Sequence, residues 1–236
     1  MGAIKPPWIS KEEFYRLPFN FCDRWCQHCQ LTSICKVYFE EQKDRKQAIK
    51  EGKDPDSIEF AFEVMAKNLK KTFKLIEKSV KQWGIDLKKI EKEAEKEDFT
   101  KPPVYEKHPL YKAAAKLSLQ IHNLLKKFEV VPIETKIEKI KDDLDVLIFY
   151  QNLILAKIAR SLSSEEREKN YPEDIKSYDD KTSAFIAYHA LDKLSQSLLN
   201  LAKEKTLDLT RKKCLTLAKA SLDLANILAE EFDFDS

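Results

Sequence analysis

The chain has 236 residues, of which 43% are hydrophobic and 35% are charged, and its 42 basic and 40 acidic residues leave a net charge of +2. This near balance gives no sign of a protein that binds polyanions. Three glycines in the whole chain are too few for the turns and phosphate-binding loops of sheet and dinucleotide folds, so the composition predicts long helices.

The sequence also lacks the segments that would place the protein in or beyond a membrane. No apolar run approaches the roughly 20 residues that a spanning helix needs, and the N-terminal "MGAIKPPWISKEE" has no apolar core typical of a signal peptide. We therefore expect a cytoplasmic protein with no membrane partner. In such a reducing compartment, clustered cysteines hold metal more often than they form disulfides.

Two short helices are predicted before the long ones. Ser10 and Glu13 have the spacing of a capping box, and Pro18 ends the helix that begins there. The second helix follows from the pattern of residues 33–52, "SICKVYFEEQKDRKQAIKEG", and Gly52 ends it. Between these two helices lies a cluster of cysteines.

The first long helix is predicted between Asp54 and Gly84. Asp54 is suited to cap it, Pro55 to occupy its first position and Gly84 to end it. Apolar residues recur along it in steps of three and four: Ile58, Phe62, Met65, Leu69, Phe73, Ile76, Val80 and Trp83. Lysines line another side, which we interpret as a solvated face: Lys67, Lys70, Lys71, Lys74, Lys78 and Lys81.

The rest of the chain repeats this helical rhythm. A short charged segment at 86–97 leads into a linker, and Pro132 is expected to open the second of the four apolar stripes that follow. These stripes are Leu110, Ala114, Leu117, Ile121, Leu124 and Phe128; Ile137, Ile140, Leu144, Leu147, Ile154, Ile158 and Leu162; Ala184, Ala187, Leu191, Leu194, Leu198 and Leu201; and Cys214, Leu217, Leu224, Leu228 and Phe232. Residues 163–180 are too polar to be expected in a core.

Each of these helices has one apolar stripe and must bury it against the others. The sequence therefore predicts an all-α fold, an up-down antiparallel helical bundle of four to five long helices with a small N-terminal Cys-rich metal module. We expect residues 1–52 to form the four-cysteine module with its short helix, and residues 53–236 to form the bundle.

Four of the five cysteines lie within fourteen residues, in the segment "CDRWCQHCQLTSIC". Cys22, Cys26, Cys29 and Cys35 have the spacing C-x3-C-x2-C-x5-C, which lets four thiolates converge on one centre without help from distant parts of the chain. Thiolates favour zinc or an iron–sulfur cluster. We therefore predict a metal site made of these four residues, whereas Cys214 lies on an apolar stripe and is expected to be a buried, inert thiol.

The spacing of the first three cysteines resembles the C-x3-C-x2-C motif that holds a four-iron cluster in radical S-adenosylmethionine enzymes. The resemblance covers eight residues, and the barrel of those enzymes needs strands and glycines that this chain lacks, so we do not assign it to that family. The spacing still favours a [4Fe–4S] cluster. One zinc ion is the alternative, although zinc sites more often show two separate C-x2-C pairs and only Cys26 and Cys29 form one.

The residues around the cysteines fit an anionic site. Cys35 is expected in the first turn of its helix, where backbone N–H groups and the helix dipole stabilise a negative sulfur. Apolar side chains are expected either to shield the site or to anchor the N-terminal segment: Phe19, Phe21, Trp25 and Leu31. Arg24 and Lys36 are placed to offset its charge, and His28 is a less favoured substitute ligand.

The sequence assigns no catalytic residue and no site for an organic cofactor. No glutamate precedes a histidine by three residues, as a di-metal carboxylate site would require, and the common nucleotide and hydrolase motifs are absent. Gln151 interrupts an apolar stripe and marks either a pocket or a core amide. We favour a protein for electron transfer or redox sensing, or alternatively a zinc-pinned binding or adaptor module, and an enzyme that uses a pocket around Gln151 is the least favoured interpretation. No nucleic-acid partner is expected, and a protein partner is left open.

Overall fold

The computed structural model describes residues 2–84, 92, 102–128, 137–168, 179–204 and 208–234. In this part of the chain the regular structure is helical and no strand forms; an isolated antiparallel bridge pairs Ala3 with Cys22. The prediction of an all-α fold is therefore confirmed. None of the helices in these ranges combines the length and the apolar character that crossing a membrane requires.

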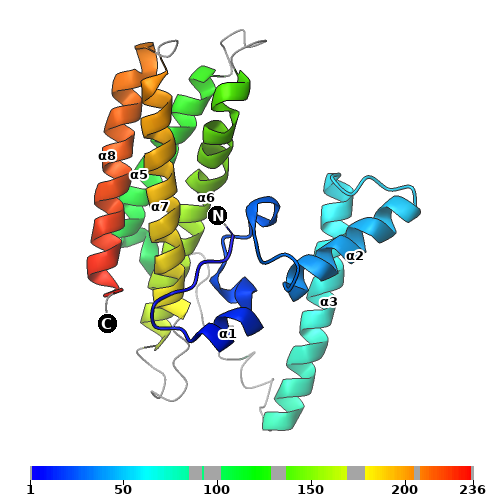
Figure 1. The fold of residues 1–236 in the computed structure, drawn as a ribbon. Helices are drawn as coiled ribbons and strands as arrows, with labels where there is room; N and C mark the ends of the chain where they lie inside the picture. Colours follow the sequence, from blue (N-terminus) through cyan, green and yellow to red (C-terminus); the bar gives the residue numbers. More distant parts are fainter. Residues whose placement is uncertain are drawn as a thin grey trace. The chain divides into compact units, whose positions relative to one another are not determined.

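Four long helices lie side by side and share one core (Figure 1). They are α5 (Pro109–Phe128), α6 (Ile137–Glu168), α7 (Asp179–Lys203) and α8 (Asp208–Glu231). α6 packs on α7, α7 packs on α8, and α5 packs on both α6 and α8. The colours of Figure 1 run in opposite directions along α7 and α8, as the short connection between these helices requires.

The apolar stripes read from the sequence supply this core. Every predicted position of α5 and α7 is buried, as are Leu147, Ile154 and Ile158 of α6 and Leu217 of α8. The thiol of Cys214 is 0% exposed, as predicted. The core also takes in part of the segment predicted to be too polar, because α6 continues to Glu168 and Ser164 is buried.

The N-terminal arm, which we define as residues 2–31, contains α1 (Lys11–Arg16) and two 3-10 helices, η1 (Pro18–Phe21) and η2 (Cys26–His28). The predicted cap of α1 is confirmed, since the hydroxyl of Ser10 accepts the N–H of Glu13 at 3.1 Å. Ile9, Phe14 and Phe21 form a small core of their own. The arm joins the four-helix core through Trp8, whose ring lies 5.3 Å from that of Phe185.

The chain divides into two compact units, residues 1–31 with 103–236, and residues 32–102. The helix of residues 36–50 and the first long helix fall in the same unit, and the division at residue 52 stays a prediction. The second unit contains α2 (Lys36–Lys50) and α3 (Ile58–Trp83). The predicted segment 86–97, apart from residue 92, and the predicted start at Pro132 lie outside the described residues.

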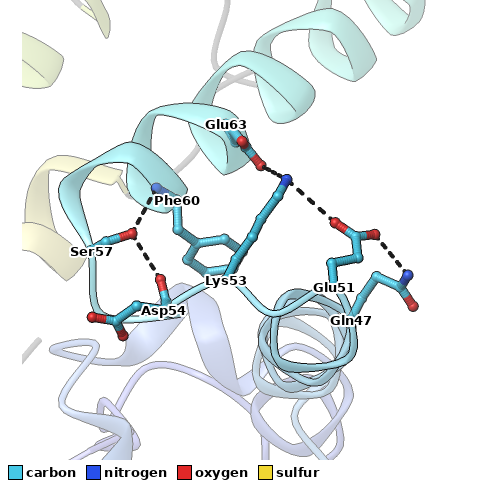
Figure 2. Close-up of polar contacts among 7 residues, drawn as sticks. All are labelled: Gln47, Glu51, Lys53, Asp54, Ser57, Phe60 and Glu63. Carbon is cyan, nitrogen blue, oxygen red and sulfur yellow. Dashed lines mark hydrogen bonds and ion pairs between the residues drawn. The ribbon is translucent and has the colours of Figure 1, made fainter.

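The connection between α2 and α3 is held by polar contacts (Figure 2). The ammonium of Lys53 lies 2.6 Å from the carboxylate of Glu63 and 3.3 Å from that of Glu51. Gln47 donates a further hydrogen bond of 2.8 Å to Glu51. These contacts link the last turn of α2 to the first turns of α3.

The start of α3 differs from the prediction. Its N-cap is Ser57 rather than Asp54, and the Ser57 hydroxyl accepts the N–H of Phe60 at 3.2 Å. Asp54 instead shapes the preceding turn, because its carboxylate accepts the N–H of Asp56 at 2.8 Å. The predicted end is confirmed, since Gly84 has a φ of +65° and its N–H bonds the carbonyl of Val80.

Candidate metal centre

The arm is folded back on itself so that its first residues lie beside the first cysteine. The N–H of Ile4 donates to the carbonyl of Phe21 at 2.8 Å, and the N–H of Asp23 donates to the carbonyl of Gly2 at 3.3 Å. Together with the bridge between Ala3 and Cys22, these bonds pair residues 2–4 with residues 21–23. The backbone on either side of Cys22 is therefore fixed by contacts to the start of the chain.

Cys22 is buried, and its sulfur lies 3.4 Å from the carbonyl oxygen of Phe19, to which the thiol donates. Burial raises the pKa of this thiol, against the effect of a backbone hydrogen bond from Arg24 and of the charges on Arg24 and Lys157. Burial likewise lowers the pKa of the Lys157 ammonium, with a smaller contribution from Arg160. Cys22 thus lies in a buried environment with two basic side chains nearby.

Cys26 and Cys29 lie at the two ends of a single 3-10 turn. Cys26 begins η2, Cys29 caps it, and the N–H of Cys29 donates to the carbonyl of Cys26 at 3.2 Å. Because a 3-10 helix has three residues per turn, side chains three apart lie on the same side. The sulfur of Cys29 also accepts the N–H of Leu31 at 3.4 Å. This C-x2-C turn suits two ligands of one centre.

Cys29 is packed against the start of the chain. A Cβ atom built on Gly2 would lie 2.8 Å from the Cα, the Cβ and the sulfur of Cys29, and Gly2 has a φ of +107°. Both observations explain why a glycine occupies this position.

Cys35 belongs to the second unit, where it lies one residue before α2 and not within its first turn as predicted. It is the N-cap residue of that helix, and its carbonyl accepts the N–H of Phe39 at 3.1 Å. Cys35 therefore lies at the N-terminus of a helix, as expected, but as the N-cap residue that precedes the first turn.

Asp23, which was not among the predicted site residues, organises the loop after Cys22. It is 0% exposed, and its carboxylate accepts hydrogen bonds from the N–H of Gly2, the N–H of Trp25 and the hydroxyl of Tyr150. An aspartate two residues before an accepted N–H is typical of an Asx turn and gives a local sequence signal. Nothing in the sequence predicts the partner on α6.

The aromatic residues of the arm serve as anchors. Trp25 stacks on Phe149 of α6 at 4.6 Å and meets Tyr150 edge-on at 5.4 Å, while the ring of His28 lies 4.3 Å from Trp25. Phe21 belongs to the small core of the arm, and Leu31 packs against it. Of the two expected roles for these side chains, anchoring the arm is the one that these contacts support.

Gln151 lies inside the four-helix core, where it is 7% exposed. Its Oε1 has no hydrogen-bond partner among the described residues. The predicted polar interruption of the α6 stripe is therefore a buried amide with one unsatisfied oxygen.

Among the residues that the structure describes, no three His, Cys, Asp or Glu side chains lie in an arrangement that could hold a metal ion. The five cysteines form no disulfide with one another. The four-cysteine site therefore stays a prediction from the sequence. Comparisons with protein-family models, with curated proteins and with solved structures find no match to this chain.

Proposed function

We propose that this chain is an iron–sulfur protein that transfers electrons or senses oxidants in the cytoplasm. In this proposal an up-down bundle carries an N-terminal metal module, and Cys22, Cys26, Cys29 and Cys35 hold a [4Fe–4S] cluster. The observation that carries the proposal is the spacing C-x3-C-x2-C-x5-C, which gathers four soft ligands in fourteen residues.

The conformation of the arm supports the proposal. The C-x2-C pair lies on one 3-10 turn, and the loop between Cys22 and Cys26 contains Arg24 with a φ of +68°. A non-glycine residue rarely adopts this conformation, and such strain is concentrated at functional sites. The hydrogen bonds to Asp23 hold the loop in this shape.

The electrostatics of the arm support it as well. Four thiolates bring negative charge to a cluster, and Arg24 and Lys157 lie close enough to Cys22 to affect its pKa. We expect these cations to stabilise the added electron and so to raise the reduction potential. Ligation would replace the hydrogen bond from the Cys22 thiol to Phe19. When bound, a [4Fe–4S] cluster accepts and releases one electron at a time.

The test is metal analysis of protein purified without oxygen. The proposal expects brown protein, with iron and acid-labile sulfide in near-equal amounts and a reversible redox couple. Colourless protein that contains one zinc ion and no sulfide would contradict it.

Single substitutions identify the ligands. We expect a strong loss of bound iron and sulfide from each of the single serine variants of Cys22, Cys26, Cys29 and Cys35. Cys214→Ser is the matched control, because that thiol is buried on α8 and lies outside the cluster segment. Retention of iron and sulfide in Cys35→Ser would remove this residue from the ligand set.

A structural zinc site is the second candidate. It is supported by the way in which the arm is already anchored to the four-helix core, through Trp8, Trp25 and the hydrogen bond from Tyr150 to Asp23. A metal that stabilised such an arm would need no redox chemistry. One zinc ion per chain, lost in the serine variants of the cluster cysteines and retained in Cys214→Ser, would support this alternative.

A further inference from the structure

Within the second unit, α3 leaves exposed the apolar stripe that we expected to be buried. Six large side chains of the stripe are between 46% and 66% exposed: Ile58, Phe62, Met65, Leu69, Phe73 and Ile76. Successive residues of this stripe are three or four positions apart, which is the spacing of a seam between paired helices. The helix is 26 residues long, so the stripe extends over several turns.

The stripe is symmetric about Leu69. Met65 and Phe73 each lie four residues from Leu69, Phe62 and Ile76 each lie seven, and Ile58 and Val80 each lie eleven. If a second α3 ran in the opposite direction with Leu69 facing Leu69, every stripe residue from Ile58 to Val80 would therefore face a stripe residue of the other copy. An interface between identical surfaces related by a two-fold axis has this property.

The charges of α3 also favour an antiparallel partner of the same sequence. Before Leu69 the helix carries two glutamates and one lysine, Glu59, Glu63 and Lys67. After Leu69 it carries one glutamate and five lysines, Glu77, Lys70, Lys71, Lys74, Lys78 and Lys81. Antiparallel pairing sets the acidic half of each helix against the basic half of the other, whereas parallel pairing brings the two basic halves together.

We propose that α3 is a dimerisation helix, which pairs antiparallel with α3 of a second copy of this chain and has Leu69 at the two-fold axis. Glu59 of one copy then lies opposite the turns that carry Lys78 and Lys81 of the other. Most of the lysines face solvent on the side away from the stripe. The proposal concerns the second unit alone and does not depend on a metal at the cysteines.

A substitution at the axis tests the contact. In sedimentation velocity over a range of concentrations, the native chain should be a dimer that dissociates on dilution. Leu69→Glu should raise the dissociation constant by roughly 100-fold, because two carboxylates would then meet at the centre of the interface. Leu75→Glu is the matched control: Leu75 is 65% exposed on the same helix, about a third of a turn from the stripe, and its replacement should leave the dimer intact.

A charge exchange tests the direction of pairing. Lys78→Glu with Lys81→Glu should weaken an antiparallel dimer by about three- to tenfold at low ionic strength, because the half of α3 that lies opposite the acidic half of the partner helix would lose its positive charge. Adding Glu59→Lys to that variant should restore the native affinity. In a parallel dimer the first variant would instead bind more tightly, because it removes repulsion between lysines, and that result would overturn the proposed geometry.

Three other results would overturn the proposal. They are a native chain that stays monomeric at high concentration, a Leu69→Glu variant that dimerises like the native chain, and a monomer whose stripe binds vesicles of anionic lipid. Circular dichroism of Leu69→Glu checks that α3 is still folded, so a loss of dimer can be assigned to the contact.

Discussion

The hydroxyl of Tyr150 donates a hydrogen bond of 2.6 Å to the carboxylate of Asp23, across 127 positions of sequence. Both side chains are buried, at 1% and 0% exposed. Burial raises the pKa of the Tyr150 hydroxyl, and the hydrogen bond to Asp23 raises it further, so this group stays protonated and acts as a donor. This contact links α6 to the loop between the first two cysteines.

Tyr150→Phe should therefore destabilise the arm more than it disturbs the four-helix core. The variant leaves the buried carboxylate of Asp23 without one of its donors, and a hydrogen bond to a charged group contributes about 1.5–3 kcal/mol. Urea unfolding should show a loss within this range, and amide hydrogen exchange should accelerate in residues 2–31. Tyr15→Phe is the control, since Tyr15 is 47% exposed and its ring contact with Phe14 is kept. Equal stability of the two variants would contradict the role given to this bond.

Gly2→Ala should loosen the arm around Cys29. The added Cβ would meet the backbone and the sulfur of Cys29 at 2.8 Å, in a conformation that L residues rarely adopt. Gly52→Ala is the matched control, because Gly52 also has a positive φ but has no atom within 4 Å of the added Cβ. The control should lose about 1–2 kcal/mol from backbone strain alone. Hydrogen exchange of residues 2–31 should accelerate in Gly2→Ala and stay native in Gly52→Ala.

The helices can be predicted from the sequence because each has its own apolar stripe and its own end signals. The stripe of α5, from Leu110 to Phe128, is buried as predicted, and Gly84 ends α3. The start of α3 differs from the prediction because Asp54 and Ser57 are both good caps, and Asp54 is used by the turn before the helix. The periodicity of apolar residues cannot predict which of two neighbouring capping residues begins the helix.

Contacts between distant segments cannot be predicted from apolar stripes and helix-end signals. An aspartate beside a cysteine gives no indication that it will be buried under a tyrosine of α6, because that depends on how the arm folds back. Periodicity likewise shows that α3 has a stripe but not what covers it. The four cysteines are close together in sequence, so a metal-binding chemistry can be inferred for them, whereas their convergence on one centre stays a prediction.

Asp179 should stabilise the protein above about pH 4 and cease to do so in stronger acid. Burial would raise the pKa of this carboxyl group, but hydrogen bonds from Arg160 at 2.9 Å and from Ser164 at 2.9 Å outweigh it, and the pKa is lowered overall. A lowered pKa in the folded state means stability that is present above the unfolded value and is lost as pH falls through the folded value. Asp179→Asn should therefore cost about 1 kcal/mol near neutral pH and progressively less in acid. In urea unfolding across pH, Asp223→Asn on the exposed side of α8 serves as the control.

His189 should make the four-helix core sensitive to mild acid. Burial lowers the pKa of its imidazole, which packs against the ring of Phe185 at 4.5 Å. The unfolded chain then binds a proton more readily than the folded chain, so stability falls as pH decreases below about 6.5. His189→Leu should reduce the difference between the unfolding midpoints at pH 7 and pH 5. His122→Leu, on the exposed side of α5, should retain the native difference. If His189→Leu keeps the native difference between the unfolding midpoints at pH 7 and pH 5, other groups must cause the acid sensitivity.

If the four clustered cysteines hold a metal as proposed, its removal should loosen the N-terminal part of the chain and leave the four-helix core intact. The core of α5–α8 is formed by side chains such as Ile121, Leu194 and Leu228, and it contains none of those four cysteines. Its protection against hydrogen exchange should therefore survive chelation, while exchange in residues 1–50 accelerates. Cys214→Ser protein carries the same four clustered cysteines and should respond to the chelator as the native chain does. Loss of protection along α7 and α8 on chelation would show that the metal stabilises the whole fold, which an N-terminal module with its own ligands cannot explain.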